Sequence, residues 1–263
     1  MSSVVLVAVA LVTLIAGGDV LYFTLLVISL VGMFEFYRVF EVQNKLPGMV
    51  GYVGILLYYM CMRMDLSGAY LELILLVLMA LMTVYVVTFP KYRTEQIMCV
   101  LFGMLYVGVM LSCIYKVRQM DDGVYHVWLI FLCSWIADTF AYLVGVTMGK
   151  HQMTPNLSPK KSVEGAVGGV AGAMLVGFLF AVVFHEHMNT SLHPYILYPV
   201  VCGIGAVISM IGDLAASAVK RNHNIKDYGT LIPGHGGILD RFDSVIFTAP
   251  VVWILLTVLE ELL

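Results

Sequence analysis

Two aspartates stand inside segments that are otherwise strongly apolar. Asp138 lies in WLIFLCSWIADTFAYLVG and Asp213 lies in VCGIGAVISMIGDLAASAVKR. An ionisable group within a membrane helix costs about 2.5–3.5 kcal/mol on insertion scales, so both are candidates for a functional site. The alternative is that each is merely solvated or paired with a neighbouring helix. Helical spacing predicts that two sets share a face: Ser134, Asp138, Tyr142 and Gly145, and then Asp213, Ser217, Lys220 and Arg221.

A second polar cluster is the stretch NLSPKKSVEGAVGG, residues 156–169. Lys160 and Lys161 place two cations at the predicted membrane surface. Ser162 and Glu164 open the next helix, and the free amides of a helix N-terminus favour an anion. The stretch therefore predicts a phosphate-binding loop, with simple anchoring to anionic headgroups as the alternative.

The third cluster is KDYGTLIPGHGGILDRFDS, residues 226–244, named here the signature segment. Its glycines allow the backbone to turn sharply and approach a ligand, and His235 lies among them. Asp240 and Asp243 flank Arg241, and two carboxylates three residues apart at a helix start can jointly hold a hard divalent cation. Arginine binds phosphate in a bidentate fork. Carboxylates beside cations are typical of metal-assisted phosphoryl or nucleotidyl transfer.

Other polar residues are left outside the predicted site. Glu35 and Arg38 have the spacing of a simple intrahelical pair. His185 and His187 lie in a loop predicted to face the opposite side of the membrane. The five cysteines are scattered singly through apolar stretches, which indicates buried thiols and no disulfide framework or zinc site.

The composition indicates the elements that must position these clusters. Of 263 residues, 61% are hydrophobic and only 12% are charged, with a mean hydropathy of +0.95. A soluble domain averages about 25% charged residues, so the chain is predicted to be an all-α, polytopic integral membrane protein. The net charge of −3 and the absence of a basic tail argue against nucleic acid as a partner. Nine transmembrane helices are predicted, at 3–16, 19–40, 48–63, 66–89, 95–115, 124–149, 163–184, 195–219 and 243–262.

Charge distribution predicts the orientation of these helices. Eleven of the 14 Lys and Arg residues fall in segments on the side of the signature segment, against Arg63, Lys116 and Arg118 on the other. The positive-inside rule therefore places the polar clusters in the cytoplasm, with the N-terminus inside and the C-terminus outside. We expect one membrane domain, 1–263, with N-terminal helices in 1–115 and a catalytic portion in 124–263. Whether the short first helix fully spans the membrane stays open.

The polar residues near the end of the chain keep a fixed spacing, which reads Ser217-x-x-Lys220-Arg221, Lys226-Asp227-x-Gly229 and Pro233-x-His235-Gly236-Gly237-x-x-Asp240-Arg241-x-Asp243. With these motifs the chain resembles the phosphatidate cytidylyltransferases, or CDP-diacylglycerol synthases, over essentially its whole length. SPKKSxEG at 158–165 and Asp138-Thr139-x-x-Tyr142 also resemble that family, and Met210 and Ala216 depart from its common pattern.

The resemblance implies a reaction in which CTP and phosphatidic acid give CDP-diacylglycerol and pyrophosphate, with Mg²⁺ as cofactor. It implies a membrane-lipid substrate, an active site on the cytoplasmic face of the plasma membrane, and no nucleic acid. The oligomeric state stays open, with a homodimer as one arrangement. The residues expected to be catalytic are Asp213, His235, Asp240, Arg241 and Asp243. Those expected to bind substrate are Lys160, Lys161, Ser217, Lys220, Arg221, Lys226, Gly236 and Gly237. The expected metal ligands are Asp138, Asp213, Asp240 and Asp243.

Two other functions fit parts of the pattern. A CTP-dependent lipid kinase of the polyprenol or phytol type would transfer the γ-phosphoryl group instead of a cytidylyl group. An ion-coupled transporter could use Asp138 and Asp213 as ion sites, although transporters usually show repeated halves and midplane helix breaks. The acyl-chain preference and the substrate that each basic residue meets are not fixed by the sequence.

Overall fold

The computed structural model describes residues 10–155, 157–188, 193–230 and 236–262. For residues 260–262 it describes the backbone alone. The chain packs as two compact units. Unit 1 includes residues 18–112 and 227–241, and unit 2 includes residues 10–17, 113–226 and 242–263. The prediction of one membrane domain with a catalytic portion at 124–263 stays a prediction, since compactness alone does not test it.

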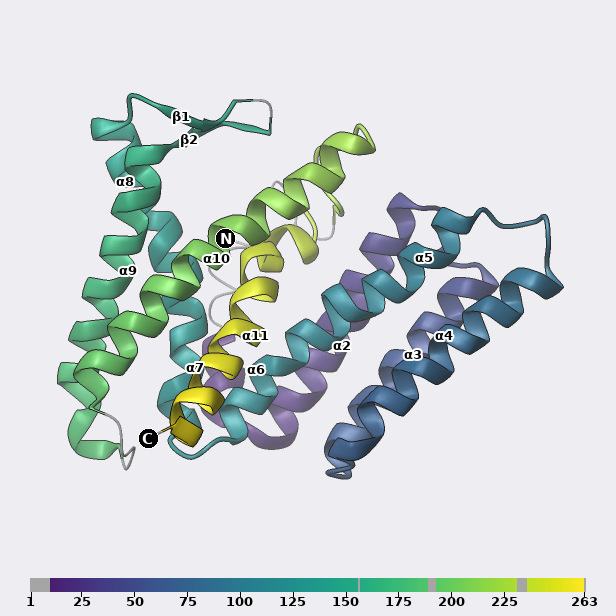
Figure 1. Cartoon of the computed structure of the whole chain (residues 1–263), viewed down its shortest axis with the longest axis horizontal. Coiled ribbons are helices and arrows are strands. Elements are labelled where there is room, and N and C mark those ends of the chain that lie inside the picture. The colour runs from purple at the N-terminus through teal and green to yellow at the C-terminus, as the bar shows by residue number, and fades with distance from the viewer. Residues whose placement is uncertain (1–9, 156, 189–192, 231–235, 263) are drawn as a thin grey trace. The chain divides into compact units, whose positions relative to one another are not determined.

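Unit 2 contains the two helices that carry Asp138 and Asp213, which are α8 (Ala137–Met148) and α10 (Pro194–Asn222). Its other helices are most of α6 (Met110–Gln119), α7 (Gly123–Phe131), α9 (Val163–Phe184) and most of α11 (Leu239–Leu262). The short 3₁₀ helix η4 (His185–His187) follows α9, and residues 10–16 form a further short helix. α9 packs along both α8 and α10, as Figure 1 shows.

A stripe of small residues explains how α9 packs so closely against its neighbours. Its buried positions include Gly165, Gly169, Ala173, Gly177 and Ala181, which recur every fourth residue and form one face of the helix. A Cβ added at Gly169 would lie 2.8 Å from a backbone carbonyl oxygen of the neighbouring helix α8. Lipid gives no hydrophobic drive for helices to associate, so small residues that let backbones approach are the usual solution in membranes.

A β-hairpin joins α8 to α9, where the sequence analysis expected only a loop. Its strands are β1 (Gln152–Thr154) and β2 (Ser158–Ser162), paired antiparallel, and they lie at one end of α8 and α9 (Figure 1). The strand β2 carries both lysines of the second polar cluster. The sequence signal was weak because Pro159 stands inside β2, and proline lacks the N–H that a strand interior uses.

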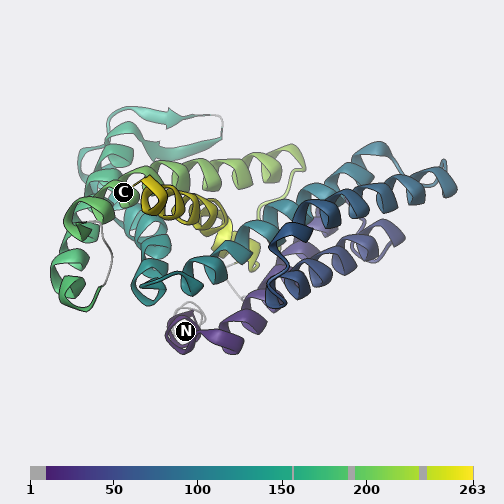
Figure 2. The ribbon, with the colours of Figure 1, turned by 60° about the horizontal axis from the view of Figure 1, so that its bottom comes forward.

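Unit 1 consists of α2 (Gly18–Val39), α3 (Leu46–Arg63), the 3₁₀ helix η1 (Ser67–Ala69), α4 (Tyr70–Val87), α5 (Thr94–Gly103) and η2 (Met104–Val109). The helices α3 and α4 lie side by side in both Figure 1 and Figure 2. The Tyr37 hydroxyl in α2 donates a 2.7 Å hydrogen bond to the Val100 carbonyl in α5. Only Leu73, Val77 and Leu81 of α4 are buried, so most of this apolar helix faces outward, as a lipid-exposed helix would.

Seven helices among the described residues are long and apolar enough to cross a membrane by length and composition. They cover seven of the nine predicted segments. Of the other two, α3 occupies the predicted segment 48–63 without meeting that criterion, and the first half of 3–16 lies outside the described residues. Two of the seven contain a stretch of π-helix, η2 and then η3 (Leu132–Ile136). The prediction of a mainly α-helical, polytopic integral membrane protein is confirmed.

Candidate functional site

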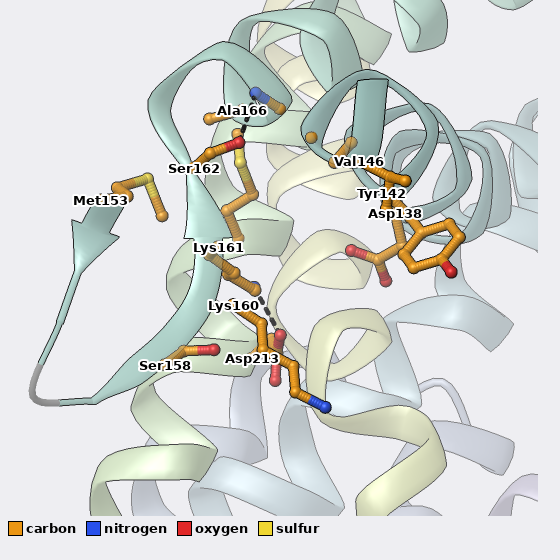
Figure 3. A pocket seen from close by; sticks show the side chains of 14 residues that line it. Asp138, Tyr142, Val146, Met153, Ser158, Lys160, Lys161, Ser162, Ala166 and Asp213 are labelled. Atoms are coloured by element: carbon orange, nitrogen blue, oxygen red, sulfur yellow. Dashed lines mark hydrogen bonds and ion pairs between the residues drawn. The ribbon is translucent and has the colours of Figure 1, made fainter. Parts of the chain in front are cut away.

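A cavity of about 560 Å³ lies within unit 2, and residues of α8, the β1–β2 hairpin, α9 and α10 line it. Its polar lining includes five residues that the sequence analysis had singled out: Asp138, Lys160, Lys161, Ser162 and Asp213. Much of the remaining lining is apolar, from Tyr142, Val146, Met153, Met210 and small residues of α8 and α9. The fold therefore brings the first two polar clusters of the sequence into one cavity (Figure 3).

An ion pair lies at the centre of the polar lining. The Lys161 Nζ is 2.5 Å from the Asp213 Oδ2, and both side chains are about three-quarters buried, with exposures of 25% and 30%. The same two residues act on the carboxylate of Asp138: Lys161 attracts it, and Asp213 repels it. Figure 3 shows the Asp138 carboxylate turned toward the side of the cavity where Lys161 and Asp213 pair. Lys161 thus pairs with Asp213 and is close enough to Asp138 to attract its carboxylate.

Asp243 joins the same electrostatic cluster from α11. Repulsion from Asp213 and Asp138 acts on its carboxylate, and Lys220 at the end of α10 attracts it. Gly212, next to Asp213, explains the close approach of α10 and α11, since a Cβ there would lie 2.9 Å from the Asp243 carbonyl oxygen. The result is three carboxylates with two lysines, all from unit 2.

The donor chemistry of this cluster fits a hard divalent cation such as Mg²⁺. Carboxylate oxygens are the ligands that Mg²⁺ prefers, and a cation would relieve the repulsion among Asp138, Asp213 and Asp243. The geometry is not that of a finished site, because no three His, Cys, Asp or Glu side chains among the described residues are grouped closely enough to hold a metal ion. In this structure Asp213 makes an ion pair with Lys161. Magnesium therefore stays a prediction.

The predicted shared face on the segment of Asp138 is correct except at its first member. Asp138, Tyr142 and Gly145 line the cavity, whereas Ser134 is fully buried and its hydroxyl donates to the Ile130 carbonyl at 3.0 Å. The reason is η3, which covers 132–136: a π-turn carries more residues per turn than an α-helix and shifts the register. A sequence analysed with a period of 3.6 cannot anticipate that shift.

Ser162 and Glu164 hold the hairpin to the start of α9. The Ser162 hydroxyl caps the helix by accepting from the Gly165 N–H at 3.1 Å. The Glu164 carboxylate accepts from the backbone N–H groups of Lys150 and His151 at 3.1 and 3.2 Å, and its other oxygen is 2.6 Å from the His151 ring. These two side chains therefore fix the position of the hairpin relative to α9, and with it the position of Lys160 and Lys161 on β2.

The described part of the signature segment within unit 1 is organised by its own carboxylate. The Asp240 Oδ2 accepts from the N–H groups of Tyr228 at 2.8 Å, Gly237 at 3.0 Å and Gly229 at 3.4 Å. The Arg38 guanidinium, from α2, donates to the Tyr228 carbonyl. Asp240 thus contacts main-chain amides in this structure, and the expectation that it also binds metal stays a prediction.

The remaining predicted residues fall in three places. Ser217 and Lys220 are half-buried on α10, and Arg221 and Lys226 are exposed near or after its end. Gly236 has a φ of +82°, a conformation that favours glycine, and Arg241 is exposed in the first turn of α11. His235 lies outside the described residues. No finding assigns any of them to a substrate.

Sequence reasoning missed Glu35, which reaches the signature segment from about 200 positions away in the chain. The signal was present, because Glu35 is an ionisable residue inside an apolar helix, the same feature that marked Asp138. Its nearness to Arg38 suggested an intrahelical pair, and the structure instead places both side chains on the backbone of the signature segment.

The fold and the cavity define a polytopic α-helical membrane protein whose site combines lysines and aspartates with apolar walls. Comparison with known proteins then gives the family. A family model described as "Cytidylyltransferase family" matches residues 1–259, so the chain belongs to that family and is a nucleotidyltransferase. It is similar to the phosphatidate cytidylyltransferase of Bacillus subtilis strain 168, 30% identical over 262 residues that cover 96% of this chain and 94% of the relative. It is also similar to the phosphatidate cytidylyltransferase of Staphylococcus aureus strain COL, 30% identical with 97% of each chain covered.

Proposed function

We propose that this protein transfers a cytidylyl group from CTP to phosphatidate, giving CDP-diacylglycerol and pyrophosphate. An oxygen of the lipid phosphate attacks the α-phosphorus of CTP and forms the new P–O bond. The bond from the α-phosphorus to the bridging oxygen breaks, and pyrophosphate leaves with that bonding pair. Family membership and the names of the relatives support this reaction.

The cavity of unit 2 is the observation that carries the proposal. Both reactants are polyanions, and one of them is also a lipid. A suitable site needs cations for phosphates beside apolar surface for acyl chains, and the cavity places Lys160 and Lys161 near Tyr142 and Val146. The aromatic ring of Tyr142 and the aliphatic side chain of Val146 offer this surface, and the two residues are 70% and 68% exposed, as groups that contact lipid would be.

Each polar residue has a defined task in this proposal. Lys160 and Lys161 attract and orient phosphate groups, and Lys220 adds positive charge at the end of α10. Asp213, Asp243 and Asp138 would hold Mg²⁺. When bound, the ion neutralises negative charge on the nucleotide and on the leaving pyrophosphate.

The proposal includes a location. The protein is an integral membrane protein, and we place it in the plasma membrane with the cavity open to the cytoplasm. Two considerations support this side: CTP is a cytoplasmic polyanion, and eleven of the 14 Lys and Arg residues belong to segments predicted to lie there. A homodimer stays a prediction that neither the fold nor the family addresses.

The test is a labelling experiment with the purified protein in detergent micelles that contain phosphatidate. With Mg²⁺ present, label from [α-³²P]CTP is expected in the lipid fraction, label from [γ-³²P]CTP is expected in pyrophosphate, and chelation of the metal is expected to stop both. Transfer of the γ-label to lipid would replace the proposal with the lipid kinase. Ion flux through reconstituted vesicles without CTP turnover would replace it with the transporter.

A further inference from the structure

Glu35 is a buried carboxylate that has no assigned role in the reaction proposed above. It lies in α2 close to the helix end at Val39, and its residue is 4% exposed. A charged group in such a place is costly unless hydrogen bonds satisfy it, so its partners indicate why it is there.

Those partners are the first amides of α11. The Glu35 Oε1 accepts from the Ile238 N–H at 3.1 Å, and its Oε2 accepts from the Leu239 N–H at 2.8 Å. The helix α11 begins at Leu239. The first N–H groups of a helix have no partner within the helix, and negative charge is favoured at that end. Glu35 therefore caps the first residues of α11, which belong with α2 to unit 1.

The same carboxylate explains two glycines of the signature segment. A Cβ added at Gly237 would lie 2.4 Å from both Glu35 oxygens, and one added at Gly229 would lie 2.1 Å from the Oε1. Real Cβ contacts are longer than 3.0 Å. Gly237 is the cleaner case, because the three nearest atoms to its added Cβ all belong to Glu35, whereas Gly229 also meets backbone.

We propose that Glu35 is a positioning residue for cytidylyl transfer: its carboxylate binds the first amides of α11 in the space that Gly229 and Gly237 leave open, and thereby orients Asp240 and Arg241. Arg38 and Asp240 act on the same main chain, through the Tyr228 carbonyl and through three backbone amides. Glu35 acts through this backbone, without touching the reacting atoms. The inference rests on the proposed function, since it concerns the orientation of residues expected to serve that reaction.

The first arm of the test is Glu35→Gln in the full-length protein in detergent. The amide has nearly the same shape but turns an N–H group toward one of the two backbone donors. We expect kcat/KM for CTP to fall about 10- to 100-fold, as for loss of a hydrogen bond to a charged group. Asp19→Asn is the matched control, because Asp19 is an exposed carboxylate at the other end of α2 that pairs with Arg63. We expect this control to stay within about twofold of wild type.

The second arm asks for a gain of activity, which general loss of stability cannot produce. Gly237→Ala alone is expected to lower kcat/KM by more than about tenfold, because the methyl group meets the carboxylate. Glu35→Asp shortens the side chain by one C–C bond, about 1.5 Å, and brings that contact close to ordinary van der Waals distance. The double variant Gly237→Ala/Glu35→Asp is therefore expected to be at least about fivefold more active than Gly237→Ala.

A third measurement keeps the inference separate from the proposed function. Amide hydrogen exchange over residues 236–241 is expected to speed up in Glu35→Gln and to stay unchanged in Asp19→Asn, with or without turnover. If wild type makes no CDP-diacylglycerol, the proposed function fails and the exchange data alone decide on the positioning. The inference is overturned if amide exchange over residues 236–241 is as slow in Glu35→Gln as in wild type. It is also overturned if the double variant is no more active than Gly237→Ala.

Discussion

Replacing Lys161 with methionine is expected to disable the cavity while leaving the fold in place. Methionine keeps most of the length and apolar surface of the side chain and removes the charge. Asp213 then loses its 2.5 Å partner, and repulsion from Asp138 and Asp243 is no longer offset by that lysine. A hydrogen bond to a charged group contributes about 1.5–3 kcal/mol, and the partial exposure of this pair favours the low end. Since about 1.4 kcal/mol is a factor of ten, kcat/KM is expected to fall about 10- to 30-fold.

The assay is CDP-diacylglycerol formation from CTP and phosphatidate in mixed micelles. Lys150→Met is the matched control, because Lys150 is an exposed lysine just before β1 and is not part of the cavity lining. The Asp213→Asn background separates the two roles of Lys161, because the part of the loss that comes from the ion pair disappears there and the part that comes from phosphate binding remains. Lys161→Met should therefore cost less in that background than in wild type. Full activity of Lys161→Met in wild type, or an equal loss in both backgrounds, would refute the ion-pair reasoning.

Three further predictions follow from the site and its supports. Asp243→Asn is expected to raise the Mg²⁺ concentration for half-maximal turnover at least about tenfold, as one carboxylate ligand is lost; an unchanged Mg²⁺ titration would remove Asp243 from the metal site. Gly169→Leu is expected to lower the midpoint of thermal unfolding in detergent and to reduce activity, because its Cβ alone would lie 2.8 Å from the Ala137 carbonyl oxygen; an unaltered midpoint would argue against the close contact of α8 and α9. In a cysteine-free background, Asn222→Cys is expected to react with an impermeant maleimide only after the membrane is opened, and Glu186→Cys to react in intact cells; the opposite pattern would invert the orientation.

The sequence predicted the helices well because their signal is physical and local. Long apolar segments ending at charges are what a bilayer requires, and seven of the nine predicted segments qualify as membrane spans in the structure. The residues of the cavity were also predictable. Asp138 and Asp213 stood out as ionisable groups in apolar helices, and Lys160 and Lys161 as paired cations at the predicted membrane surface. What joined them into one site was tertiary packing.

The failures came from features whose local signal was absent or pointed to a simpler explanation. The register of Ser134 depended on a π-turn, which no spacing rule of 3.6 residues anticipates. The hairpin that carries Lys160 and Lys161 contains Pro159, which argues against a strand when the sequence is taken alone. The role of Glu35 depended on partners more than 200 residues away, and its nearer neighbour Arg38 suggested a simpler explanation.

The small-residue face of α9 has a thermodynamic consequence for whatever binds in the cavity. Gly165, Ala166 and, across from them, Ala141 and Gly145 form part of its wall, and such residues have no side-chain rotamers to lose. The main chain therefore sets the shape of this part of the cavity. A ligand that binds there does not restrict the rotamers of any side chain along that surface. Binding along this wall should accordingly carry little unfavourable conformational entropy from the protein, and that contribution to affinity should change little with temperature.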